Sequence, residues 1–142
     1  MRHGIWLTVI LAGAALLSLL QAQSAKSVWD GVYSADQASR GATLYASECA
    51  SCHADDLLGT GPMPALAGAG FRKEWDGQSV GDLFERLSVS MPADQPGKLT
   101  RAQDADVLAF ILKSNDFPAG TAEMPPSTPD LSKIRFIAAR PK

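Results

Sequence analysis

The sequence predicts a small all-α domain with three main helices and long connecting loops. Three segments, at about 35–48, 80–88 and 101–114, each follow a helix start signal and carry apolar residues at helical spacing. No stretch alternates apolar and polar residues over the length of a strand. The 142 residues are enough for one domain rather than two.

Residues 1–22 have the pattern of a secretory signal peptide. A positively charged start at Arg2 precedes an uncharged apolar run over 5–20, and small residues follow from Ala22. This run is shorter than the roughly 20 residues that span a bilayer, so we expect cleavage near Ala22. The alternative is an uncleaved membrane anchor. Export would place the mature chain where disulfides form, but its two cysteines allow at most one.

The first helix is expected after an extended lead-in at 23–33. Ser34 with Gln37 three positions later is a capping-box pattern, in which each residue satisfies a backbone N–H of the other. Ala38 and Gly41 would share one face of this helix. Their small size predicts that another helix crosses closely there.

The second and third helices also follow capping patterns, which begin at Ser79 and Thr100. Glycine and proline are frequent in 54–70 and again in 90–97, so both segments are predicted to be loops. A loop as long as the first one inside a compact domain usually has a function or wraps around something.

The three helices define a domain at 34–120, which a proline-rich tail at 121–142 follows. Three helices of this size with such loops bury little apolar surface by themselves. The chain therefore needs a large apolar group at its centre. The tail has a short apolar segment at 131–137, and we expect it to form a strap over its own domain, with a docking segment for a partner as the alternative.

The motif Cys49-Ala50-Ser51-Cys52-His53 predicts covalent attachment of haem c. Residues three apart lie on one helical face, so both sulfurs can reach the two haem vinyl groups, and His53 can bind the iron. A thioredoxin-like dithiol would need a βαβ setting, which the sequence lacks. Structural zinc needs four ligands, and the mature chain offers two cysteines and one histidine.

The sixth position of the iron has several candidate ligands. His3 would leave with the signal peptide, so a second histidine from the same chain is excluded. The methionines of the mature chain are Met63, Met91 and Met124. Met91 is favoured because it lies in a loop between two capped helices, where it can reach the opposite haem face. Met63 is second because it follows His53 by only ten residues. A lysine, the chain amine, water or an empty position are the other options.

Further stretches carry a family resemblance over about 28–120. Besides the C-x-x-C-H motif and Met91-Pro92-Ala93-Asp94 they are Val28–Tyr33, Ala38–Gly41, Tyr45–Glu48, Pro64–Gly68, Phe71, Trp75, Pro96–Gly97 and Asn115–Gly120. With these residues the chain resembles class I c-type cytochromes, in particular the small cytochrome c associated with bacterial quinoprotein (PQQ-dependent) alcohol dehydrogenases. Asn115-Asp116 departs from the Asn-Gly that the family usually has after the last helix.

The resemblance implies a cytochrome c fold, with the helices and loops wrapped around one covalently attached haem. It implies that His53 is the proximal ligand and Met91 the distal ligand. The carbonyl of Pro64 would accept a hydrogen bond from His53 Nδ1, and the indole N–H of Trp75 would lie near a haem propionate. The plainer alternatives are a turn at Pro64 and a core position for Trp75.

The resemblance also implies a helix contact, in which Gly41 and Tyr45 pack against Phe110. An exposed haem edge would be the route for electrons. The residues expected to rim it are Ala50, Ala54, Leu57, Met63 and Ala93.

These features predict a periplasmic electron carrier rather than an enzyme. With His53 and Met91 both on the iron, no position remains for substrate. The expected donor is a dehydrogenase, with a quinoprotein alcohol dehydrogenase as the candidate, and the acceptor is an oxidase or another cytochrome. The alternatives are a haem enzyme, a gas or redox sensor with an open sixth position, and a subunit docked permanently on a dehydrogenase.

The charge balance limits the partners. The net charge of −2 excludes nucleic acid, whose binding needs a basic surface. Without Arg2 the chain has 12 basic and 15 acidic side chains, a balance that suits a basic protein partner. Contact with a membrane is expected only if residues 1–22 stay attached.

Overall fold

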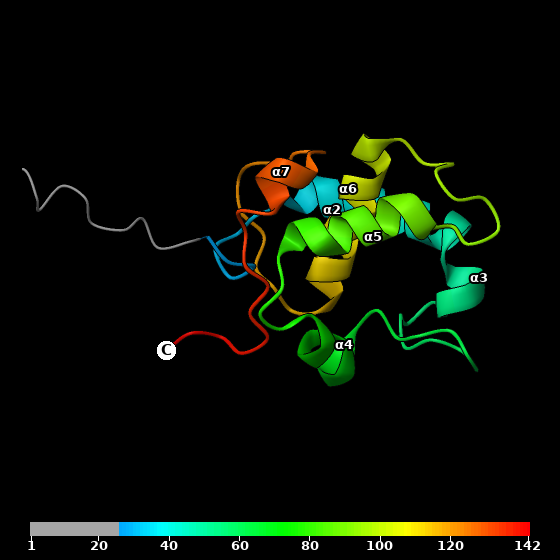
Figure 1. Cartoon of the computed structure of the whole chain (residues 1–142), viewed down its shortest axis with the longest axis horizontal. Coiled ribbons are helices and arrows are strands. Elements are labelled where there is room, and N and C mark those ends of the chain that lie inside the picture. The colour runs from blue at the N-terminus through cyan, green and yellow to red at the C-terminus, as the bar shows by residue number, and fades with distance from the viewer. Residues whose placement is uncertain (1–25) are drawn as a thin grey trace, which may run out of the picture.

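The computed structural model describes residues 26–142, and these residues are all-α, as predicted (Figure 1). Their extended segments meet only in isolated bridges. The helices in this part are α2 (Ala35–Glu48), α3 (Ala50–His53), α4 (Gly68–Trp75), α5 (Val80–Ser90), α6 (Arg101–Ser114) and α7 (Thr128–Leu131). None of them is long and apolar enough to cross a bilayer. The expected signal peptide at 1–22 lies outside the described residues.

The three long helices, α2, α5 and α6, begin where their capping patterns predicted. The hydroxyl of Ser34 accepts a hydrogen bond from the backbone N–H of Gln37 at the start of α2. Complete capping boxes begin α5 at Ser79 and α6 at Thr100. Such caps stabilise a helix by about 1 kcal/mol each, so the local sequence fixes where these helices start.

Two short helices were not predicted. The glycines of α4 suggested a loop, but the helix buries Phe71 and Trp75, which lie four residues apart on one face. In α7, the side chain of Ser127 caps a single turn with proline near its start. Both helices depend on burial of an apolar face rather than on helix propensity, which is why the sequence pattern missed them.

The crossing of α2 and α6 is the most extensive helix contact in the described chain. A Cβ atom on Gly41 would lie 1.8 Å from the carbonyl oxygen of Asp106 and 3.0 Å from Cβ of Phe110. The rings of Tyr45 and Phe110 pack with their centroids 5.2 Å apart. The expected contact of Gly41 and Tyr45 with Phe110 is therefore confirmed.

Gly41→Ala is expected to destabilise the protein by at least about 2 kcal/mol, because a methyl group there must push α6 away. The matched control is Gly70→Ala in α4, where an added Cβ meets no atom within 4 Å. In the control, alanine should be neutral or stabilise the helix by up to about 1 kcal/mol. Guanidinium unfolding of both variants measures the difference, and equal stabilities would show that the close crossing is not needed.

The C-terminal segment, residues 121–142, lies against its own domain as a strap. Leu131 and Phe136 are fully buried. The ring of Phe136 packs edge-on against Phe71 of α4 and against Phe117, with centroids 6.1 and 5.2 Å away. The backbone N–H of Phe136 also donates to the carbonyl of Gln78, at 2.9 Å. Figure 1 shows this segment running from α7 beside α5 towards the C-terminus.

Candidate functional site

A cavity of about 710 Å³ lies between α3, α4, α5 and α6. Its apolar walls include Leu83 and Leu87 from α5 and Val107 and Ile111 from α6. All six residues that the sequence singled out line it: Cys49, Cys52, His53, Pro64, Trp75 and Met91. The fold thus brings residues from four separate segments of the sequence to one apolar space.

The two cysteines are held by a single helical turn. Cys49 ends α2, and its carbonyl accepts hydrogen bonds from the backbone N–H groups of Cys52, at 3.1 Å, and His53, at 2.9 Å. Both thiols are free. Burial, and after it the negative charge of Glu48, raises the pKa of the Cys49 thiol to about 11. A thiol with so high a pKa is a poor nucleophile at neutral pH, which argues against a redox-active dithiol.

The imidazole of His53 is buried and held in one orientation. Its Nδ1 lies 2.8 Å from the carbonyl oxygen of Pro64. A carbonyl only accepts hydrogen bonds, so Nδ1 carries the proton and Nε2 keeps a free lone pair. The loop that supplies Pro64 is bonded back to the motif, because the hydroxyl of Thr60 donates to the carbonyl of Cys52 at 2.8 Å. This is the arrangement that the resemblance implied for a ligand histidine.

Met91 comes from the end of α5. Its backbone N–H donates to the carbonyl of Leu87 at 3.0 Å, so the end of the helix sets its position. Met63 also lines the cavity, but it adjoins Pro64, the residue that holds His53. Met124 is buried elsewhere, where its backbone exchanges hydrogen bonds with the side chain of Gln37. The structure therefore leaves two methionines at the cavity.

Trp75 is the last residue of α4 and lines the cavity beside Phe71. Because the sequence did not predict α4, it did not predict that this helix forms a wall. Charged groups at the cavity were missed as well: Glu48, Glu74, Arg86, Asp94 and Lys98. In the sequence these residues differ from ordinary surface charges in nothing but their nearness to the motif or to Met91. Many surface charges also lie near such residues, so this signal was too weak to identify them.

The predicted rim is wrong at Leu57. Its side chain is only 3% exposed, whereas a rim residue must reach the surface. The reason is that its carbonyl accepts the backbone N–H groups of Leu66 and Ala67, which folds the loop over it. Met63 and Ala93 are exposed at the cavity, as a rim requires.

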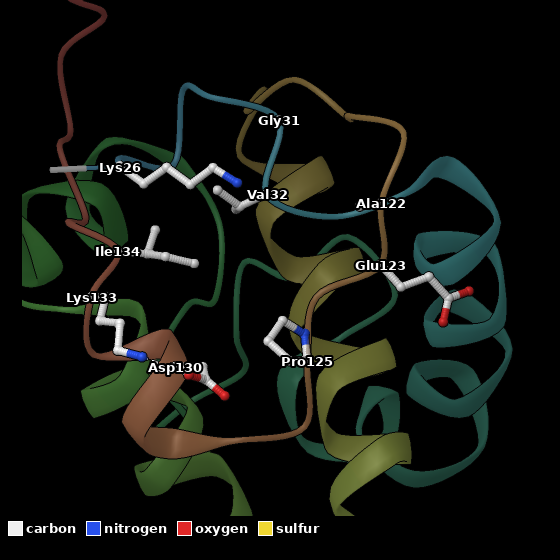
Figure 2. Close-up of a pocket in the computed structure, with 9 residues that line it drawn as sticks. All are labelled: Lys26, Gly31, Val32, Ala122, Glu123, Pro125, Asp130, Lys133 and Ile134. Carbon is white, nitrogen blue, oxygen red and sulfur yellow. Dashed lines mark hydrogen bonds and ion pairs between the residues drawn. The ribbon is translucent and has the colours of Figure 1, made fainter. Parts of the chain in front are cut away.

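A second cavity, of about 250 Å³, lies between the lead-in and the C-terminal segment (Figure 2). None of the predicted site residues lines it. Its acidic groups already have partners, since Asp130 pairs with Lys133 at 2.7 Å and Glu123 with Arg40 at 2.9 Å. Its chemistry therefore does not point to a ligand.

The larger cavity fits a covalently attached haem. It is apolar and brings two thiols three residues apart to the same space as an oriented imidazole and a thioether. Thiols for the vinyl groups and N and S donors for the iron are what a c-type haem with histidine and methionine ligands requires.

A comparison with protein-family models agrees with this reading. The family described as "Cytochrome C oxidase, cbb3-type, subunit III" matches residues 36–111, a stretch that contains all six predicted site residues. A comparison with curated proteins gives no match. Among solved structures, the sulfane dehydrogenase SoxCD from Paracoccus pantotrophus matches at 25% identity with a TM-score of 0.47. That match covers 63% of this chain and 53% of the other, so it spans about half of the solved chain.

Proposed function

Since the chain belongs to the cbb3-type subunit III family and is a class I c-type cytochrome with covalently bound haem c, we propose that it carries single electrons in the periplasm. In this proposal Cys49 and Cys52 hold the haem, and His53 and Met91 bind its iron. The observation that carries the proposal is the placement of an oriented imidazole and a thioether at one apolar cavity.

The bound haem would supply a reversible one-electron couple. The chain's own residues tune it. Pro64 orients the imidazole of His53 and makes its nitrogen a better donor. The thioether of Met91 favours the reduced state and raises the potential. The apolar walls would keep water away from the bound haem, and with His53 and Met91 both on the iron no position would remain for a substrate.

The partners are proposed from the cavity mouth and the charge of the chain. Met63, which is 40% exposed, and Ala93 offer an apolar contact where the cavity opens. A small apolar contact suits short-lived encounters between redox proteins. The net negative charge favours a basic partner. We propose a dehydrogenase as donor, with a quinoprotein alcohol dehydrogenase as the candidate, and an oxidase or another cytochrome as acceptor.

The test is whether the reduced protein binds carbon monoxide. With both His53 and Met91 on the iron, the spectrum should not change under carbon monoxide, and a redox titration should show one reversible one-electron transition. Addition of peroxide should produce no turnover. Binding of carbon monoxide by the wild type would instead indicate an open sixth position, and the protein would then be a haem enzyme or a gas sensor.

A further inference from the structure

Asp104 is a buried carboxyl at the end of the cavity wall. It lies in the first turn of α6, and its side chain faces the contact with α5. Val107 and Ile111, three and seven residues further along the same helical face, line the cavity. From α5, Ser88 reaches Asp104, and the residue before it, Leu87, lines the cavity. Asp104 thus lies about one helical turn from the cavity-lining Val107, and Ser88 lies next to the cavity-lining Leu87.

This carboxyl is shielded from solvent and poorly satisfied. Asp104 is 2% exposed and Ser88 is 8% exposed. Oδ1 of Asp104 and Oγ of Ser88 are both buried without a hydrogen-bond partner among residues 26–142. A charged carboxylate is costly in such a place. Burial therefore raises the pKa of Asp104 above its ordinary 3.8. The nearby Ser88 hydroxyl, which is close to the carboxyl but makes no well-aligned hydrogen bond to it, and the charge of Arg101 oppose the rise.

The one cation that acts on Asp104 from its own helix is already engaged. The guanidinium of Arg101 lies 3.3 Å from the carboxylate of Glu85 on α5 and stacks over the ring of Phe84. Its side chain is 42% exposed, so solvent screens its charge. Arg101 consequently leaves the charge of Asp104 largely uncompensated.

The negative charge of Asp104 reaches the haem attachment point. The pKa of Cys49 is raised by burial, then by the charge of Glu48 at the end of α2, and also by the charge of Asp104. Glu48, however, is paired with Lys98 at 2.6 Å, which compensates part of its charge. Of these two carboxyls, Asp104 is the one without a bonded cation. A change of charge on a haem held by Cys49 would therefore act on it.

We propose that Asp104 couples electron transfer to proton binding. Its carboxylate takes up one proton from solvent as the site gains one electron, and its carboxylic acid releases that proton as the electron leaves. This inference rests on the proposed function, because it needs a redox-active iron in the cavity. In this role Asp104 exchanges a proton with solvent, and it neither binds the iron nor attaches the haem.

The direction follows from electrostatics. The oxidised site carries one more positive charge, which favours the ionised carboxyl, so the pKa of Asp104 is lower in the oxidised than in the reduced protein. Between these two pKa values the midpoint potential must fall as pH rises, by at most about 59 mV for each tenfold fall in proton concentration. Outside that interval Asp104 adds no pH dependence, because its protonation is then the same in both redox states.

The experiment is a measurement of midpoint potential against pH for the holoprotein and for Asp104→Asn. The wild type should show a downward step at a pH above the ordinary aspartate value, and this step should be missing in the variant. Haem propionates and the other charged groups at the cavity are the same in both proteins, so they cannot cause a difference between the two curves. Redox-difference infrared spectra give a second readout, in which a carboxylic acid band appears on reduction and is absent in Asp104→Asn.

Ser88→Ala is a second test that remains available if Asp104→Asn fails to fold. It keeps the carboxyl but removes a hydroxyl that favours the ionised form, so the step should move to higher pH. Asp106→Asn is the matched control, because Asp106 is a buried carboxyl on the same helix that is paired with Arg40. In this control variant the step in midpoint potential should stay unchanged.

The inference is overturned if the wild type has no step or if Asp104→Asn keeps it. In either case the proposed function would still hold if the wild type shows a reversible one-electron transition. If the wild type shows no such transition, both the proposed function and the role of Asp104 are wrong.

Discussion

Met91→Ala is expected to lose the weak long-wavelength absorption band of methionine bound to ferric haem and to lower the midpoint potential. The thioether favours ferrous iron, so its loss should cost at least about 0.1 V, within the roughly 0.8 V range over which axial ligands set haem potentials. The reduced variant should also bind carbon monoxide, because its sixth position is open. Absorption spectra and a redox titration of wild type and variant measure all three effects.

Met63→Ala is the matched control for this prediction. Met63 lines the same cavity, but it adjoins Pro64 and is 40% exposed. The change should leave the long-wavelength band and the potential nearly as they are. If Met63→Ala loses the band and Met91→Ala keeps it, the distal ligand is Met63 and the assignment made here is reversed.

Removal of both thiols, by Cys49→Ala with Cys52→Ala, should abolish covalent haem and prevent accumulation of folded protein. Without the haem, an apolar cavity of about 710 Å³ would stay unfilled. At about 24 cal/mol per Å³, such a cavity costs as much as the entire stability of a small domain, about 5–15 kcal/mol. A haem stain of a denaturing gel and the yield of exported protein measure the two effects.

Ser51→Ala tests whether that loss is specific to the thiols. Ser51 lies between the two cysteines and is exposed, so its replacement should change neither haem content nor yield. Normal amounts of covalently bound haem in the double cysteine variant would contradict the attachment proposed here.

The sequence predicted the parts of this fold that local interactions decide. Ser34, Ser79 and Thr100 satisfy backbone groups within one turn, so the pattern alone located the starts of the three long helices. The C-x-x-C-H motif was equally local, because its spacing is a property of one helical turn. The choice of Met91 as a candidate ligand rested on its place between two capped helices. The structure brings Met91 to the same cavity as His53.

The parts that depend on tertiary contacts could not be predicted. The helix α4 forms because Phe71 and Trp75 are buried against the rest of the chain, and its glycines concealed it. Leu57 has a positive φ of 62°, which a leucine adopts only when surrounding contacts require it. The sequence does not single out Asp104, because it lies in the first turn of a helix, where negative charge is common. Its burial depends on α5, which the local sequence around Asp104 does not encode.

The aromatic contact of Phe136 makes the end of the chain part of the support for the haem site. Phe136 packs against Phe71, and Phe71 and Trp75 form one wall of the cavity. The backbone of Phe136 also bonds to Gly77 and Gln78, directly after that wall. Residues near the C-terminus thus pack on the outside of a wall whose inside lines the cavity. A protein bound to the C-terminal segment would therefore be mechanically connected to the redox centre without touching it.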